Sequence, residues 1–233
     1  MTDLFTLTPL EREALRLSLW ISIWAVVAIL PPGIFISWLL ARKKFVGKTL
    51  LDGLTHLPLV LPPVVIGYLL LVMLGRKGII GRFLYEDLGI SFMFNWKGAA
   101  VASAVVAFPL LVRAIRLSIE QVDEGLEAAA RTLGAGPFRV FFTITVPLIM
   151  PGIITGVILA FARSLSEFGA TITFVSNIPG ETRTLPLALY TLTQVPNGET
   201  GAFRLCVISV LVAFIALILS EFSSRYVFSK VRG

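Results

Sequence analysis

The stretch Glu120–Pro147 reads EQVDEGLEAAARTLGAGPFRVFFTITVP and separates two long apolar runs. It carries charged residues and, at positions 134–137, a Gly-Ala-Gly-Pro turn between two helix-forming pieces. Glycine after a helix and proline at the start of the next are typical of such a turn. We therefore expect two short helices at a membrane surface, because an apolar protein has little reason to keep this polar segment unless a soluble partner docks there.

Long apolar blocks make up most of the remaining chain. Of the 233 residues, 56% are hydrophobic and 15% charged, whereas a soluble domain has roughly 45–50% and 25%. Five runs are long enough to cross a bilayer as helices: Leu15–Leu40, Leu54–Leu74, Gly98–Ile119, Val146–Leu165 and Leu205–Ser220. The sequence predicts an all-α polytopic membrane helix bundle of about five transmembrane helices, formed by residues 1–233 as one domain. The pieces Gly169–Val175 and Thr184–Val195 are too short to span alone, which leaves the role of residues 169–203 open.

The second apolar run contains three prolines, Pro58, Pro62 and Pro63. Proline inside a helix removes a hydrogen bond and clashes with the preceding turn. Bilayer helices tolerate it where neighbours or water satisfy the freed carbonyls. The prolines therefore indicate either packing kinks or a bent helix that lines a central pathway.

The basic residues favour one orientation in the membrane. Lys43, Lys44 and Lys48 follow the first run closely, while acidic residues precede it. Positive charge marks cytoplasmic loops, so we expect the N-terminus outside and the C-terminus in the cytoplasm. Topology and anionic lipid explain the formal charge of +6 more simply than nucleic acid does.

The sequence argues against an enzyme. It has a single histidine, His56, a single cysteine, Cys206, and no Gly-x-x-x-x-Gly-Lys-Ser/Thr loop for nucleotide phosphates. We expect no metal site and no cofactor in this chain.

One charged pair continues the fourth apolar run. Arg163 and Glu167 are four residues apart on one predicted helix face and could pair. Charge at membrane depth usually faces a cavity or the bundle interior. Arg163 and Ser164 could donate to a passing oxyanion, or the pair could be a salt bridge that only fixes the helix end.

The polar stretch resembles the "EAA" loop of ABC importer permeases, Glu-Ala-Ala, three residues, Gly, nine residues and Ile-x-Leu-Pro. The spacing fits from Gly134, with Val146 in the leucine slot, but Ala128 occupies the glutamate slot and the acid lies one residue earlier. Taken singly, Glu127 and Arg131 would fit a solvated helix equally well. The resemblance implies an ATPase-coupling loop at about 120–147 that includes Glu127, Ala128, Ala129, Ala130, Arg131, Gly134, Gly136, Pro137, Ile144 and Pro147.

Further stretches are similar to molybdate ABC importer permeases: LPLVLPPVVIGY (57–68), RTLGAG (131–136), FARSLSEFGATITF (161–174) and NIPGETRT (177–184). Sulfate and thiosulfate permeases share the Ser-Glu-Phe-Gly element more loosely. The resemblance implies a type I importer fold in the cytoplasmic (inner) membrane, a second copy of the chain, two ATP-binding subunits carrying ATP and magnesium, and a periplasmic or lipid-anchored oxyanion-binding protein. It implies a pathway for molybdate, with Pro62, Pro63, Arg163, Ser164 and Glu167 as candidate lining residues. Tungstate or sulfate transport, and a secondary transporter or channel, are the alternatives.

Overall fold

The computed structural model describes the backbone of residues 7–232 and, in the last helix, the side chains up to residue 216 and at 218. These residues form helices and loops without a strand. In chain order the elements are α1 (Pro9–Arg42), α2 (Lys48–Val60), α3 (Pro63–Leu74), α4 (Ile79–Leu88), α5 (Trp96–Glu120), α6 (Glu124–Thr132), α7 (Pro137–Val140), the π-helical segment η2 (Phe141–Thr145), α8 (Val146–Leu165), α9 (Gly169–Val175), α10 (Leu185–Thr193) and α11 (Glu199–Arg232).

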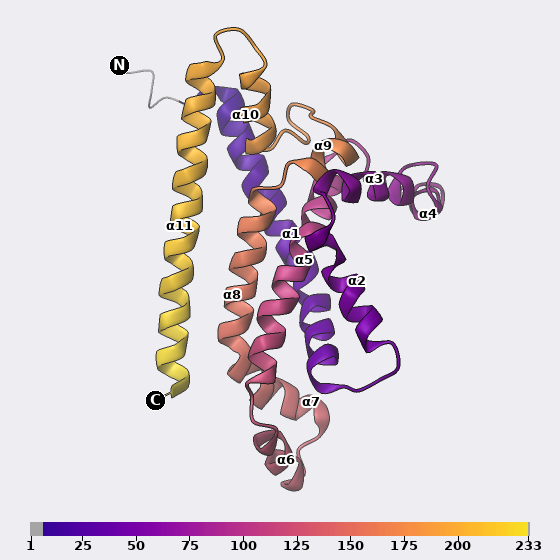
Figure 1. Cartoon of the computed structure of the whole chain (residues 1–233), viewed down its shortest axis with the longest axis vertical. Helices are drawn as coiled ribbons and strands as arrows, with labels where there is room; N and C mark the ends of the chain where they lie inside the picture. Colours follow the sequence, from indigo (N-terminus) through magenta and orange to yellow (C-terminus); the bar gives the residue numbers. More distant parts are fainter. Residues whose placement is uncertain (1–6, 233) are drawn as a thin grey trace.

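The helices α1, α5 and α8 form the centre of an elongated bundle (Figure 1). Small residues occupy their contact faces: Ala25 on α1, Ala107 on α5 and Ala160 on α8 are fully buried in one cluster. Small side chains let helices approach closely where the surrounding lipid is itself apolar. At Gly33 of α1 a β-carbon would lie 2.6 Å from Leu111 Cδ2, so this approach needs the glycine.

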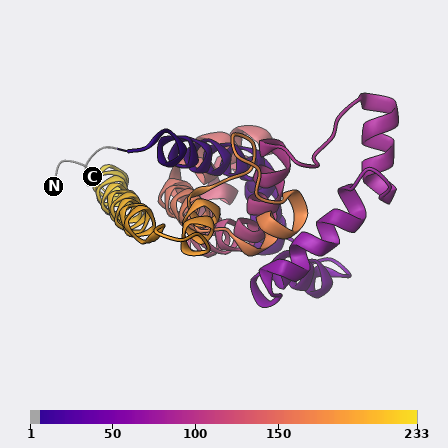
Figure 2. The same ribbon diagram turned by 90° about the horizontal axis from the view of Figure 1, so that it is seen from above.

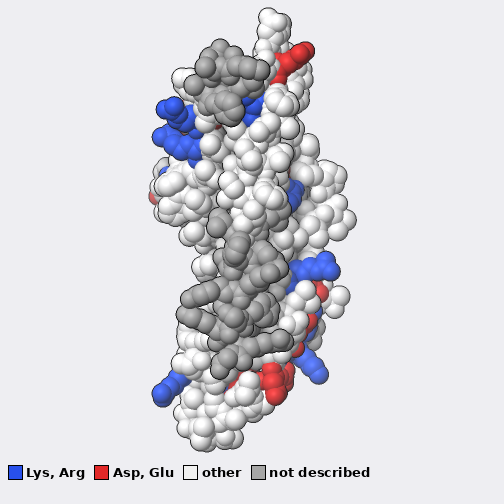
Figure 3. All heavy atoms as spheres, turned by 90° about the vertical axis from the view of Figure 1, so that its left-hand side faces the viewer, with Lys and Arg blue, Asp and Glu red and all other residues white. Residues whose placement is uncertain are grey.

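Four helical stretches are long and apolar enough to cross a membrane: α1, α5, Pro137–Leu165 and Glu199–Ala216 of α11. The bent pair formed by α2 and α3 makes a fifth crossing if it counts as one span. On the face in Figure 3, the charged side chains gather toward the two ends, and the described middle is largely uncharged. The predicted all-α bundle of about five spans is confirmed.

The run Leu54–Leu74, expected as one span, is sharply broken. The axes of α2 and α3 differ by 116°. Pro62 and Pro63 cannot donate backbone hydrogen bonds, and each proline drives the preceding residue toward an extended conformation. Leu61 and Pro62 accordingly have ψ angles of 142° and 135°. As a consequence, α3 and α4 extend sideways from the bundle (Figure 2).

Residues 169–203 contain two short helices that pack on the bundle. A β-carbon on Gly67 of α3 would lie 2.6 Å from the Ala170 carbonyl oxygen of α9, so these two helices are in close contact. Pro186 lies in the first turn of α10 and begins this helix rather than interrupting it. The Leu185 amide donates to Ser18 Oγ of α1 at 2.6 Å. With seven and nine residues, α9 and α10 are too short to cross a bilayer.

The two ends of the bundle carry different elements (Figure 1). The start of α1 lies with α9 and α10 at one end, and α6, α7 and the end of α11 lie at the other. The polar stretch Glu120–Pro147 and the C-terminal end of α11 therefore lie at the same end of the bundle.

Candidate functional site

The polar stretch folds as two short helices around a glycine turn, as the sequence predicts. Asp123 caps α6, because its Oδ1 accepts a hydrogen bond from the Gly125 amide at 2.8 Å. Gly134 ends the helix with a φ of +85°, and the Ala135 amide donates to the Ala130 carbonyl at 3.1 Å. Pro137 is the first residue of α7. The turn thus needs glycine at 134, where β-carbons are disfavoured.

Glu127 faces the bundle rather than solvent. Its side chain is 9% exposed, and its Oε1 accepts a hydrogen bond from Thr145 Oγ1 at 2.9 Å. Arg42 Nη2, from the end of α1, lies 3.4 Å from the same oxygen, and Arg131 Nη2 lies 3.6 Å from Oε2. Glu127 is thus paired with Arg131, four residues later on the same helix. The carboxylate ties α6 to both α1 and η2.

Arg42 is the residue of this cluster that the sequence analysis missed. Its Nη1 donates to Glu124 Oε1 at 2.9 Å and its Nη2 to the Val122 carbonyl at 2.9 Å. The contacts join residues 82 and 80 positions apart. No local spacing in the sequence could have indicated them, since only the packing of α1 against α5 brings the two segments together.

Part of the surface of the polar stretch is exposed and apolar. Ala128 and Ala129 are exposed and Ala130 is half-buried. Leu133 is 89% exposed and Phe138 is 81% exposed. Exposed apolar patches of this kind mark interaction surfaces in soluble regions of a protein. We call this face, formed by Leu126, Ala128, Ala129, Leu133, Phe138 and Phe142, the coupling face.

The end of the polar stretch joins the next span without a turn. The Val146 amide donates to the Phe141 carbonyl, five residues earlier, within η2. Ile144 is half-buried in this segment. Pro147 follows directly and lacks the N–H that would continue an α-helical ladder. A π turn at this place keeps Pro137–Leu165 helical despite the proline.

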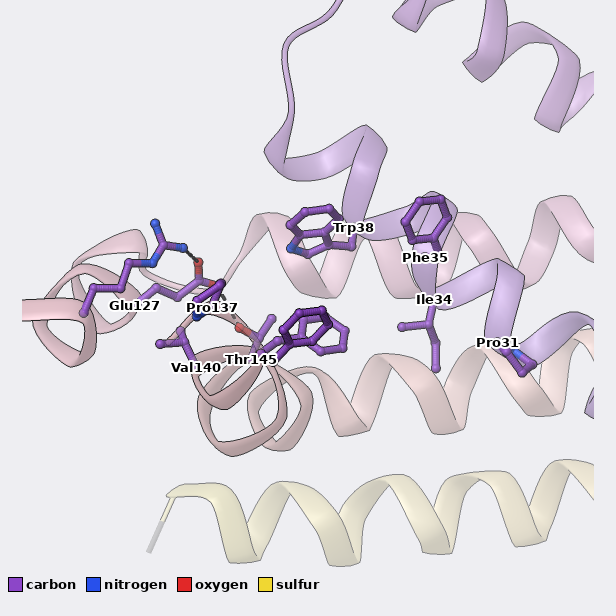
Figure 4. Close-up of a pocket in the computed structure, with 11 residues that line it drawn as sticks. Pro31, Ile34, Phe35, Trp38, Glu127, Pro137, Val140 and Thr145 are labelled. Carbon is purple, nitrogen blue, oxygen red and sulfur yellow. Dashed lines mark hydrogen bonds and ion pairs between the residues drawn. The ribbon is translucent and has the colours of Figure 1, made fainter. Parts of the chain in front are cut away.

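A hollow of about 510 Å³ lies between the polar stretch and the second half of α1 (Figure 4). Trp38 forms one wall and contacts Phe141 edge-on, with ring centroids 6.4 Å apart. Glu127 and Thr145 line the end nearest α6. The volume lies within the roughly 300–1,000 Å³ range of ligand pockets, but its polar groups already bond to one another.

The candidate pathway residues lie around the junction of α8 and α9. Arg163 Nη1 is 2.8 Å from Glu167 Oε2, and the Glu167 side chain is 1% exposed. Glu167 Oε1 also accepts a hydrogen bond from the Ala170 amide at 2.8 Å, which caps α9. Ser164 is buried, and its hydroxyl has no hydrogen-bond partner among the described residues.

The candidate prolines at the start of α3 lie close to the segment that follows the charged candidates of α8. At Gly169, the first residue of α9, a β-carbon would lie 3.0 Å from Pro63 Cβ. Pro63 begins α3 with Pro62 as its cap. The bend between α2 and α3 thus lies against the segment that follows Glu167. The Arg163–Glu167 pair lies at the end of α8, and both interpretations of it, as pathway residues and as a salt bridge that fixes the helix end, stay predictions.

The chain is similar in sequence to known membrane transport proteins. The family described as binding-protein-dependent transport system inner membrane component matches residues 33–231. The molybdenum transport system permease protein ModB of Escherichia coli (strain K12) is 64% identical over 219 residues, covering 94% of this chain and 96% of that protein. The protein of the same name from Haemophilus influenzae is 58% identical over 222 residues, covering 95% and 97%.

A solved structure shares the fold. It is the bacterial alginate ABC transporter in complex with alginate pentasaccharide-bound periplasmic protein, with a TM-score of 0.74 and 18% sequence identity. The match covers 97% of this chain and 82% of that chain.

Proposed function

The chain belongs to the family of binding-protein-dependent transport system inner membrane components, and we propose that it is the permease subunit of an ATP-driven importer that carries molybdate across the cytoplasmic membrane. The observation that carries this proposal is the 64% identity with a molybdenum transport permease over 94% of the chain. The helical spans and the exposed coupling face fit the same function.

Energy for transport comes from a partner in this proposal. The sequence lacks a phosphate-binding loop, so ATP and magnesium bind to two ATP-binding subunits. A second copy of the chain completes the pathway, and an oxyanion-binding protein delivers the cargo on the outer side. The coupling segment faces the cytoplasm, which places the N-terminus outside and the C-terminus inside.

The coupling face would dock in a groove of the ATP-binding subunit. Apolar side chains on a surface turn, among them Leu133 and Phe138, suit a hydrophobic groove. Gly134 and Gly136 shape the turn, and the stretch from Ile144 to Pro147 connects it to α8. Glu127 would hold the segment to α1 rather than touch the ATPase. Movement of the docked helices would then be transmitted directly to α1 and α8, the spanning helices to which they are joined.

The bend at Pro62 and Pro63, together with Arg163, Ser164 and Glu167, would line or shape the pathway. Because Glu167 is buried and caps α9, its role would be to hold Arg163 and the helix junction in place. If the double variant R163A/E167A regained the transport that R163A loses, the pair would be only a salt bridge.

Reconstitution of the complete importer tests the proposed function. Purified permease and ATP-binding subunits are placed in proteoliposomes with the binding protein, and ATP hydrolysis and uptake are measured with molybdate, tungstate and sulfate. We expect molybdate to stimulate hydrolysis and to be taken up only when ATP is present. Uptake driven by an ion gradient without ATP would instead support a secondary transporter, and stimulation by sulfate alone would assign another oxyanion.

A further inference from the structure

A groove between α5 and α8 carries polar side chains that the sequence analysis did not connect. Its volume is about 360 Å³. From α5 it is lined by residues at helical spacing, and from α8 by residues on one face: Leu110, Arg113, Ala114, Leu117, Ser118 and Gln121, with Pro151, Gly152, Thr155 and Leu159. The polar members are one guanidinium, one amide and two hydroxyls, and no carboxylate lines the groove.

The groove is on a different face of α5 from the one that packs on α1. Leu111, Val112 and Ile115 on the α1 side are fully buried, and Ser37 of α1 donates to the Val112 carbonyl at 3.0 Å. Arg113 and Leu117 are exposed. Among the lining residues, Gly152 of α8 packs against Ser118 of α5, where a β-carbon on the glycine would overlap the serine side chain. The chain by itself therefore leaves this face of the α5–α8 pair uncovered.

Arg113 differs from its neighbour Arg116. Arg116 is paired with Glu120 at 2.8 Å and with Asp52 of α2 at 2.9 Å. Among the described residues, the Arg113 guanidinium has no hydrogen-bond or ion-pair partner. It lies seven residues before the end of α5, about 10 Å along the helix from that end. A cation inside a span is costly unless it faces water, a cavity or an anion.

We propose that Arg113, with Ser118 and Gln121, forms a binding subsite for the transported tetrahedral oxyanion near the cytoplasmic end of the pathway. The Thr155 hydroxyl lines the groove but donates to the Pro151 carbonyl at 2.9 Å. The assignment rests on the proposed function. A planar guanidinium can donate two parallel hydrogen bonds to an oxyanion, and the serine hydroxyl and glutamine amide can donate to its remaining oxygens. The absence of a carboxylate in the lining leaves the site free of repulsion.

A lipid phosphate presents the same chemistry to the same donors, because basic side chains near a helix end also reach the head-group region. The structure favours the cargo because the donors converge on a groove between two helices instead of standing on a convex helix surface. The experiment must separate these two sources.

The test uses the complete importer in proteoliposomes with saturating molybdate-loaded binding protein. The variants are R113Q, R113K and Q121E, and the matched control is K97Q, which removes an exposed charge at the other end of the same helix. For each variant, uptake and ATP hydrolysis are measured together, and phospholipid retained by the purified complex is quantified by mass spectrometry.

We expect R113Q to lower molybdate moved per ATP hydrolysed at least about tenfold, the size of one charge-assisted hydrogen bond. R113K should recover part of the loss, Q121E should lose transport by repulsion, and K97Q should match the wild type. Stimulation of hydrolysis by the loaded binding protein should persist in every variant.

Unchanged uptake per ATP in R113Q would overturn the subsite. Unchanged uptake with loss of bound phospholipid would assign Arg113 to a lipid phosphate and would overturn it equally. Should R113Q fail to assemble, Q121E decides, because normal transport in Q121E contradicts an anion in the groove. A wild-type complex that molybdate does not stimulate would instead contradict the proposed function.

Discussion

Two glutamates on α6 contact the same arginine in different surroundings. The Glu124 side chain is 79% exposed and the Glu127 side chain 9%, while both reach Arg42. An exposed pair contributes little because water and salt screen it. A buried pair behaves differently, since removal of one partner leaves an uncompensated charge. Substitutions at Glu124 and Glu127 therefore compare an exposed with a buried contact to the same arginine.

Replacing Glu127 should destabilise the assembled importer more than replacing Glu124. E127A leaves the Thr145 hydroxyl without its acceptor and removes one of the three contacts of Arg42, and we expect a loss of about 1–3 kcal/mol. E124A should change stability by less than about 1 kcal/mol. Thermal unfolding of the detergent-solubilised complex measures both. Equal losses would mean that Glu127 is as solvated as Glu124.

The turn of the coupling segment offers a second matched pair. G134V forces a β-branched residue into a φ of +85°, at a cost of roughly 1–3 kcal/mol, and should weaken capture of the ATP-binding subunit and uptake while the bundle still inserts. G136A should be neutral, because Gly136 has a φ of −67° that any residue adopts. Pull-down and uptake assays compare the two. Normal values for G134V would show that another residue can make this turn.

At the scale of single residues, local chemistry was predictable and tertiary partners were not. Gly134 and the Glu127–Arg131 pair follow from helix spacing and turn chemistry. The burial of Glu127 and its contact with Arg42 depend on the position of the end of α1 beside α6. The sequence around Glu127 does not indicate that position.

At the scale of elements, the break between α2 and α3 shapes one side of the molecule. Three prolines indicated a bend, but the angle of 116° depends on where α3 finds a partner. That partner is α9 (Gly169–Val175), whose length indicated that it does not span a bilayer but not which helix it contacts. Its contact with Gly67 is closer than a β-carbon would allow.

The α3–α9 contact predicts opposite effects for two glycines of the bent pair. G67A places a β-carbon 2.6 Å from the Ala170 carbonyl oxygen and 2.8 Å from Thr173 Cβ, so the helices must separate, at a cost of about 1–3 kcal/mol. G53A on α2 meets nothing within 4 Å and should be neutral or stabilising by up to about 1 kcal/mol. Thermal unfolding of the complex compares them, and a stable G67A would mean that α3 moves freely from α9.

At the scale of the whole molecule, the long apolar runs were sufficient to predict the bundle, since lipid leaves few alternatives to helices for a spanning chain. The side of the membrane was harder. Counting of basic residues gives only a weak bias, whereas the tight cluster after α1 and the exposed coupling face agree. The sideways projection of α3 and α4 could not be read from hydropathy.

Reporter fusions should locate the two chain ends on opposite sides of the membrane. A tag active only in the cytoplasm should report from the C-terminus and remain silent at the N-terminus, because four spans and one bent pair counted as a fifth cross the membrane an odd number of times. A periplasmic reporter should give the reverse result. Activity of the cytoplasmic tag at both ends would require an even number of crossings.

The π turn of η2 fixes the rotation of the coupling face, about the helix axis, relative to the bilayer portion of α8. Each residue of an α-helix advances the side chains by about 100°, so deleting one residue within 141–145 would rotate everything before it by about that amount. Leu133 and Phe138 would then point away from their present direction while α8 and the other long helices kept their sequences. The length of this five-residue segment, more than its composition, is therefore what natural variation must preserve.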